Sequence, residues 1–78
     1  MTEVTTNIAF RRGDEGEAVL DIRSRLAMLA LASTEVSQPH VFDADLDRAV
    51  REFQQGRGLT VDGVVGSSTY RALEEARW

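Results

Sequence analysis

The sequence predicts an all-α domain, a compact three-helix bundle whose helices begin at glycines. Apolar residues recur at helical spacing in three separate stretches, and two of these stretches follow a pair of glycines three residues apart. Turn-forming residues separate the stretches. The 78 residues have room for one core only. The three apolar stripes can therefore be buried only against one another.

Residues 1–9 are expected to form a flexible tail, because they are mostly polar, rich in threonine and without a helical period. Burial of apolar surface is expected to begin from Ile8 and Phe10 onward. The folded domain then comprises residues 10–78 and leaves no room for a second one.

The first helix is expected over residues 17–30. Its apolar stripe consists of Val19, Ile22, Leu26 and Leu29. Three charged residues, Asp21, Arg23 and Arg25, are assigned mostly to the other side of the helical wheel. The helix is therefore expected to be amphipathic, with its charged residues in water.

Residues 31–42 are expected to form the longest loop, since they combine polar residues with Pro39. Asp43 is a good N-cap for the second helix. The apolar stripe of that helix is Leu46, Ala49, Val50 and Phe53. Gly58 is expected to take the left-handed conformation and end the helix near Arg57, with Leu59 folding back toward Phe53.

Residues 59–65 place three valines around an Asp62-Gly63 turn, which favours either a short extended connection or a two-strand hairpin. The third helix is expected to begin at residues 66–68 and to run to the C-terminus. Its inward stripe is Thr69, Ala72, Leu73 and Ala76, with Tyr70 and Arg71 off the stripe.

A three-residue step recurs where the helices begin: Gly13, Gly16, Val19 and then Gly63, Gly66, Thr69, with a degenerate copy at His40, Asp43, Leu46. Helix capping in a compact bundle explains this pattern, with glycine permitting a close backbone approach. A second interpretation is that a glycine start leaves backbone N–H groups uncovered, which would attract a carboxylate. The best placed start for such a site is Gly66-Ser67-Ser68.

Composition excludes several classes of function. The net charge of −4 and the isoelectric point near 4.8 oppose binding to nucleic acids and anionic membranes. The chain has no cysteine, and its one histidine, His40, lies in a loop. No apolar run approaches the roughly 20 residues of a membrane span. We expect no catalytic residue, no metal site and no cofactor.

The run from Phe10 to Leu73 resembles the peptidoglycan-binding type 1 family. Three segments carry the resemblance: the opening Phe10, Gly13, Gly16, Val19, Ile22 and Leu26; Ala49-Val50-Arg51-Glu52-Phe53-Gln54, similar to an Ala-Val-x-x-Phe-Gln signature; and residues 58–66 with Thr69 and Leu73. The pattern is most similar to N-terminal modules of actinobacterial proteins related to N-acetylmuramoyl-L-alanine amidases. It departs from the family at Arg23, commonly Gln, at His40 and Asp43, commonly Gly, and at Leu46, commonly Thr.

The resemblance implies a non-catalytic module that binds peptidoglycan or a muropeptide fragment, as one domain of a larger cell-wall amidase-like protein. Any hydrolase activity would lie in a domain outside this chain. The candidate ligand-binding residues are Gln54, Arg57, Asp62, Gly63, Gly66, Ser67, Ser68 and Tyr70. Gln54 is placed to reach a ligand amide, and Tyr70 offers an exposed ring on which a sugar can stack.

One alternative remains open. The same fold can serve as a protein-interaction or regulatory module of cell-wall synthesis, with the apolar residues of loop 31–42 contacting a synthesis protein or the catalytic domain of the parent chain. The altered start of the middle helix and the acidic charge motivate this alternative. We expect a monomer in either case. No signal peptide is evident, so a cytoplasmic location follows if Met1 is the native start, and a cell-wall location if the chain is an excised domain.

Overall fold

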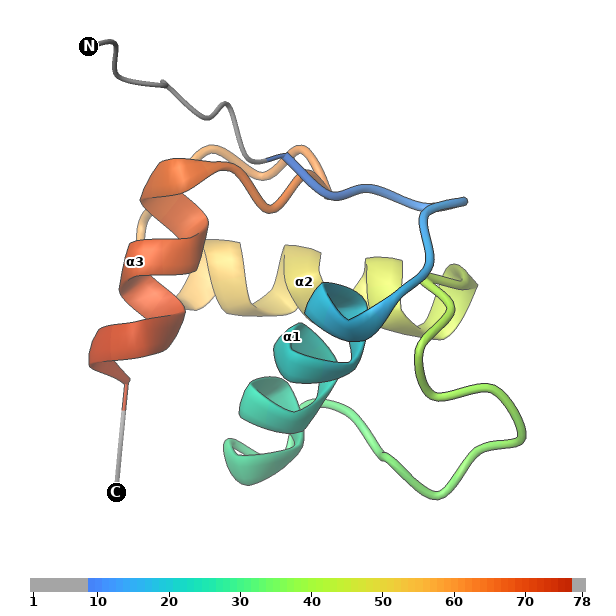
Figure 1. Ribbon diagram of the computed structural model, residues 1–78. Helices are drawn as coiled ribbons and strands as arrows, with labels where there is room; N and C mark the ends of the chain where they lie inside the picture. The colour runs from blue at the N-terminus through green and yellow to red at the C-terminus, as the bar shows by residue number, and fades with distance from the viewer. Residues whose placement is uncertain (1–8, 77–78) are drawn as a thin grey trace, which may run out of the picture.

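The computed structural model describes residues 9–76 and confirms the three-helix bundle (Figure 1). The helices are α1 (Glu17–Met28), α2 (Ala44–Gly56) and α3 (Ser67–Glu75). Helix α1 packs against both α2 and α3. No described helix is long and apolar enough to cross a membrane. Of the predicted tail, only the exposed Ala9 belongs to the described residues.

The core is built from the predicted stripes. All of its fully buried apolar side chains are less than 4% exposed: Val19, Ile22, Leu26, Phe42, Leu46, Ala49, Val50, Phe53, Val65 and Leu73. Phe42 and Val65 come from outside the helices, each directly before the N-cap residue of α2 or α3. The core is therefore closed by the chain segments that lead into these helices as well as by the helix faces.

Residues 10–16 connect the starts of α2 and α3. Phe10 exchanges two backbone hydrogen bonds with Val65, of 3.1 and 2.8 Å. Farther along, Gly13 donates to the Phe42 carbonyl, and the Phe42 amide donates to the Asp14 carbonyl. Figure 1 shows this segment, in blue, passing from the start of α3 toward the start of α2. Two isolated β-bridges, Phe10 with Val65 and Glu15 with Val41, are the only strand-like pairing in residues 9–76. Segment 59–65 is therefore an extended connection, and the hairpin alternative is wrong.

Helices α1 and α2 end in the same way. After α2, Gly58 has a φ of 71°, its amide donates to Gln55, and the Leu59 amide donates to the Gln54 carbonyl at 2.9 Å. After α1, Ala30 has a φ of 64°, and the Leu31 amide donates to the Leu26 carbonyl at 2.9 Å. Both patterns are Schellman motifs. Only the motif after α2 was predicted, because Gly58 marked it.

Two predicted helix ends are wrong. Helix α1 ends at Met28 rather than at residue 30, because the left-handed Ala30 turns the chain. Helix α3 ends at Glu75 rather than at the C-terminus, because Ala76 has a ψ of 129°, which is extended backbone. Residues 77–78, the rest of the predicted helix, lie outside the described part of the chain.

Candidate functional site

Gln54 organises the loop between α2 and α3. Its side chain is completely buried. Nε2 lies 3.0 Å from Asp62 Oδ1, 3.0 Å from the Val64 carbonyl and 3.1 Å from Thr69 Oγ1, and these three acceptors share its two hydrogens. Oε1 accepts from the amides of Asp62 and Gly63. Gln54 was expected to reach a ligand. Its polar atoms are hydrogen-bonded to the loop, so Gln54 holds the loop in position from the buried side.

Asp62 is the acidic group that this arrangement holds in place. Its Oδ1 accepts from the Val64 amide at 2.9 Å as well as from Gln54. The Val64 hydrogen bond and then that of Gln54 lower the pKa of Asp62 below its ordinary value, so the carboxylate is ionised at neutral pH. Its side chain stays exposed with one oxygen fixed, which makes it a positioned acceptor for an N–H or O–H group.

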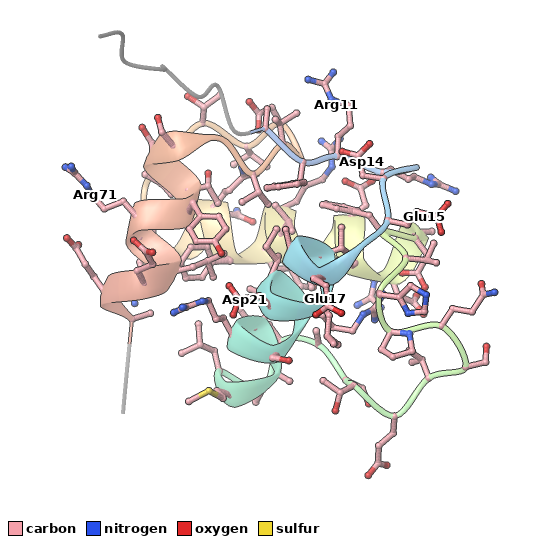
Figure 2. The ribbon with its side chains drawn as sticks, in the orientation of Figure 1. Arg11, Asp14, Glu15, Glu17, Asp21 and Arg71 are labelled. Carbon is pink, nitrogen blue, oxygen red and sulfur yellow. The ribbon has the colours of Figure 1, made fainter. Side chains whose placement is uncertain are left out.

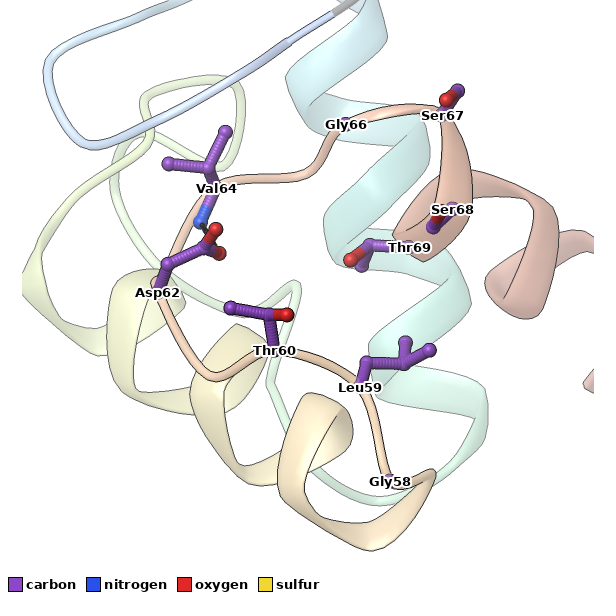
Figure 3. Close-up of a pocket in the computed structure, with 9 residues that line it drawn as sticks. All are labelled: Gly58, Leu59, Thr60, Asp62, Val64, Gly66, Ser67, Ser68 and Thr69. Atoms are coloured by element: carbon purple, nitrogen blue, oxygen red, sulfur yellow. Dashed lines mark hydrogen bonds between the residues drawn. The ribbon is translucent and has the colours of Figure 1, made fainter.

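A pocket of about 440 Å³, here called the Asp62 pocket, lies between this loop and the start of α3. Figure 3 shows its lining as an arc of loop that runs from Gly58 past Asp62 to Gly66 and on into α3. The lining residues are Gly58, Leu59, Thr60, Asp62, Val64, Gly66, Ser67, Ser68 and Thr69. Hydroxyl groups, one carboxylate and backbone therefore make up most of its surface.

The start of α3 supplies hydrogen-bond donors to the Asp62 pocket. Gly66 is the N-cap and offers no side chain, so the N–H groups of the first turn are left for solvent or a ligand. Gly66 has a φ of −90°, and a Cβ added there would meet nothing within 4 Å. The close backbone approach expected at this glycine is therefore absent. What it contributes is an uncovered helix start.

A hollow of about 300 Å³ lies beside the Asp62 pocket and shares Ser67 and Ser68 with it. Its third lining residue is Arg71, which Figure 2 shows pointing away from the body of the bundle. Sequence reasoning placed Arg71 off the apolar stripe but did not link it to the site. The signal was its spacing, since residues three and four apart on a helix are neighbours.

Gly63 stands behind the pocket lining rather than in it. Its φ is 75°, and a Cβ there would collide with Asp47 Oδ1 and come within 2.8 Å of Arg51. Gly63 is buried, and its positive φ favours glycine, while a Cβ would also require the Asp47 and Arg51 side chains to move. Gly63 thus packs against side chains of α2, and its ligand role stays a prediction.

Two further predicted residues lie elsewhere. The guanidinium of Arg57 is exposed and sits 5.3 Å from the centroid of the Phe53 ring. Tyr70, expected to be off the packed face, is partly buried against the core, and its hydroxyl donates to Asp21 on α1. Asp21 also accepts from Arg25 at 3.0 Å. Burial raises the pKa of Asp21, but the hydrogen bonds from Tyr70 and Arg25 lower it by more. The net pKa of Asp21 is therefore below its ordinary value.

The Asp62 pocket thus brings together four of the predicted residues: Asp62, Gly66, Ser67 and Ser68. It leaves Gln54, Arg57, Gly63 and Tyr70 outside its lining. Sequence reasoning missed five lining residues, which are Gly58, Leu59, Thr60, Val64 and Thr69. They all belong to the 58–69 segment that carries the family-like pattern, and their hydroxyl and backbone groups were the available signal.

A second buried polar side chain, Arg23, holds the loop between α1 and α2. The prediction that it lies on the solvent side of the helix is wrong, since it is 1% exposed. Its Nε donates to the Pro39 carbonyl at 2.8 Å, one terminal nitrogen donates to Val41 and Asp43, and the other to Ser33 at 3.3 Å. The spacing could have placed Arg23 correctly, because it is i+4 from Val19, in the same register that buries Val50 on α2.

Asp43 joins Arg23 to the start of α2. As predicted, it is the N-cap, and its Oδ1 accepts from the Leu46 amide at 3.0 Å. The same oxygen pairs with Arg23 at 3.1 Å. Burial raises the pKa of Asp43, but the Leu46 amide and the Arg23 guanidinium lower it more, so the net pKa lies below the ordinary value.

Residues 9–76 contain no group of three or more His, Cys, Asp or Glu side chains that could hold a metal ion. His40 is exposed in the loop, and its carbonyl accepts from Gly16. The residues that line the Asp62 pocket offer hydroxyl groups, backbone groups and one carboxylate.

A family described as "Putative peptidoglycan binding domain" matches residues 15–73. The chain is similar to the N-acetylmuramoyl-L-alanine amidase CwlM of Mycobacterium tuberculosis, with 46% identity over 90% of this chain and 19% of the relative. It is also similar to the spore cortex-lytic enzyme of Bacillus cereus, with 35% identity over 95% of this chain and 28% of the relative.

Among solved structures, the chain is similar to the N-terminal domain of SleB, with a TM-score of 0.81 and 33% identity. The match covers 92% of this chain and 96% of that one. The chain thus spans 96% of a solved domain but only 19% and 28% of the curated relatives it matches.

Proposed function

Because the chain belongs to the peptidoglycan-binding domain family, we propose that it binds peptidoglycan or a muropeptide fragment in the Asp62 pocket. The observation that carries the proposal is the position of this pocket, which is formed by residues 58–69, inside the segment that the family matches. The candidate contacts are Asp62 and the start of α3 from Gly66 to Ser68.

The chemistry of the pocket suits a peptide or an acylated sugar. Ionised Asp62 accepts a hydrogen bond from an amide or a hydroxyl group, while the uncapped N–H groups of α3 donate to a carbonyl or carboxylate oxygen. A peptide stem offers both kinds of group in alternation, and serine hydroxyls can serve either. Arg71, on the adjoining hollow, adds a positive charge for an acidic group.

The module is proposed to bind without cutting. The described residues that line the Asp62 pocket include no nucleophile paired with a general base. Since the chain covers 19% of the amidase relative and 28% of the cortex-lytic one, hydrolysis by a parent protein would be carried out by another domain.

The interaction-module alternative gains little support from the loop that was to provide it. Leu31 and Ala32 are partly buried and pack against the core. Among residues 9–76, the large apolar side chains that face solvent are Met28 and Val61, which lie on different elements. Binding to peptidoglycan therefore remains the function we propose.

Sedimentation with purified, insoluble sacculi tests this function. Asp62→Asn keeps the shape and the hydrogen bonds of Oδ1 but removes the charge, and Ser68→Leu places a bulky side chain at the pocket without disturbing the core. We expect each to reduce retention about tenfold, Asp62→Asn by weakening one charge-assisted hydrogen bond and Ser68→Leu by excluding the ligand sterically. Glu75→Gln, which changes the net charge equally at an exposed site, is the matched control. Equal retention of all four proteins would refute the proposed site, and no retention of the unmodified protein would refute the function.

A further inference from the structure

The chain contains a second pocket that repeats the placement of the first. The Asp62 pocket lies behind the Schellman end of α2, between the loop that follows and the first turn of α3. A pocket of about 270 Å³ lies behind the Schellman end of α1, between Ala30–Val36 and the first turns of α2 at Asp45 and Arg48. We call it the Arg23 pocket, because Arg23 also lines it.

The two pockets also share a supporting contact. Gln54 donates to the Val64 carbonyl, and Arg23 donates to the Val41 carbonyl. Each of these carbonyls lies two residues before the N-cap of the next helix, which is Gly66 in α3 and Asp43 in α2. The repeat that was visible in the sequence at the helix starts therefore extends to the side chains beneath the two pockets.

One edge of the Arg23 guanidinium faces the second pocket. The Nε atom and one terminal nitrogen bond to Pro39, Val41 and Asp43, none of which lines this pocket. The other terminal nitrogen bonds to the carbonyl of Ser33, which does line it. A guanidinium has five N–H donors, and partners among residues 9–76 account for four. The fifth lies on the edge next to Ser33.

A buried guanidinium hydrogen without an acceptor is costly. Since Arg23 is 1% exposed, the pocket that it lines is the place from which an acceptor can reach this hydrogen. The second charged donor on the lining is Arg48, with a side chain that is 64% exposed and paired with Asp45 at 3.4 Å and with Glu52 at 3.9 Å. Such exposed pairs are weak, so Arg48 can exchange these carboxylates for that of a ligand.

The charged side chains that line the two pockets differ in kind. The Asp62 pocket has one carboxylate and no basic residue on its lining, whereas the Arg23 pocket has two guanidiniums and one carboxylate. The first therefore favours N–H and O–H groups near its loop, and the second favours an anionic oxygen.

We propose that the Arg23 pocket is a second ligand site, which binds a carboxylate of a peptide stem through the free edge of Arg23 and through Arg48. This rests on the proposed function, because the stem belongs to the same polymer that occupies the Asp62 pocket. Two sites of opposite preference on one small domain let a polymer with repeated stems bind at both, and linkage raises the overall affinity without a stronger contact at either.

NMR titration of the ¹⁵N-labelled chain tests the second site with two probes, N-acetyl-D-alanyl-D-alanine and its C-terminal amide, which differ only in the carboxylate. We expect the acid to shift the side-chain N–H of Arg23 and the amides of residues 30–36, with an affinity about tenfold above that of the amide. Arg48→Gln, at an exposed site that folding does not need, should weaken these shifts severalfold. Arg11→Gln, an equal charge change away from the pocket, should leave them unchanged.

Equal shifts from the acid and the amide, or no shifts at residues 30–36 with millimolar acid, would overturn the second site. Retention on sacculi separates this failure from failure of the proposed function. A chain that is retained on sacculi and loses retention with Asp62→Asn, yet shows no response at Arg23, binds through the Asp62 pocket alone. A chain that is not retained and responds at neither pocket contradicts both proposals.

Discussion

Two loops, residues 30–42 and residues 58–66, connect successive helices in the same way but are supported by different buried polar side chains. Each follows a Schellman helix end and leads into the next helix. Under the first lies a permanently charged guanidinium, Arg23, and under the second a neutral amide, Gln54. The backbone of a repeat can therefore be kept within one chain while the polar group that supports it changes charge.

The amide and the guanidinium stabilise their loops by different means. Gln54 both donates and accepts, so it satisfies two loop amides and loop acceptors at once. Arg23 only donates, and it collects carbonyls and the carboxylate of Asp43. The amide needs no counter-ion, whereas the guanidinium needs one, and Asp43 provides it while also capping α2.

The largest expected effect is the loss of the Gln54 amide. Gln54→Leu keeps the approximate volume but leaves the amides of Asp62 and Gly63 and the Thr69 hydroxyl without their partner. We expect the free energy of unfolding to fall by about 3 kcal/mol, because each buried unsatisfied group costs about 1–3 kcal/mol. Urea denaturation measures it, with the exposed neighbour in Gln55→Leu as control. A fall below about 1 kcal/mol would mean that Gln54 does not support the loop.

Arg23→Gln tests the other loop by introducing the amide that the family commonly has there. The shorter side chain cannot hold both Pro39 and Asp43, and we expect a loss of about 2 kcal/mol in the free energy of unfolding. Hydrogen exchange should quicken at residues 33–41 and stay unchanged at residues 60–66. If exchange quickens equally in both loops, the two supports are not independent. Arg71→Gln controls for the loss of charge.

Substitutions at the residues that end α1 and α2 are expected to change the free energy of unfolding by a smaller amount, with opposite signs at the two positions. Ala30 has a φ of 64° and Gly58 a φ of 71°, and a side chain is unfavourable in this region of backbone conformation. Ala30→Gly should therefore raise the free energy of unfolding, and Gly58→Ala should lower it, each by about 1 kcal/mol. Thermal unfolding of both variants measures the two changes. The same sign for both would show that the two helix ends are not equivalent.

The pH dependence at Asp43 is the smallest effect. Its folded pKa lies below the ordinary value of 3.8, so the ionised carboxylate stabilises the fold above pH 3.8. This contribution is lost as the pH falls below that value and through the folded pKa. In Arg23→Gln the folded pKa of Asp43 should rise, and the loss should begin at a higher pH. A ¹³C NMR titration of the carboxyl group measures both pKa values, and an unchanged pKa in the variant would contradict the ion pair.

The sequence was sufficient for the helices and most of the core, because Leu46, Ala49, Val50 and Phe53 repeat at helical spacing and Asp43 and Gly58 mark the ends of α2. The end of α1 could not be predicted in the same way. Ala30 takes a conformation that is usual for glycine, and the contacts of the Leu31 amide with the helix are what hold it there.

The site was predicted in part for a related reason. Residue type suggested that Gln54 faces a ligand and that Arg23 faces water. Spacing alone would have placed both on the buried side, since Gln54 is i+4 from Val50 and Arg23 is i+4 from Val19. Asp62, Ser67 and Ser68 were found because turn and helix-start residues are exposed by geometry. What a buried polar group bonds to depends on contacts distant in sequence, and periodicity does not contain them.

The most direct test of the central claim is NMR mapping of a soluble muropeptide, N-acetylmuramoyl-L-alanyl-D-isoglutamine, on the ¹⁵N-labelled chain. Binding in the Asp62 pocket predicts that the largest shifts fall on the amides of residues 58–69, that Asp62→Asn weakens them, and that the muropeptide is recovered uncut. Shifts confined to the face of α1 and α2 away from this pocket, or a muropeptide that is hydrolysed, would contradict the account.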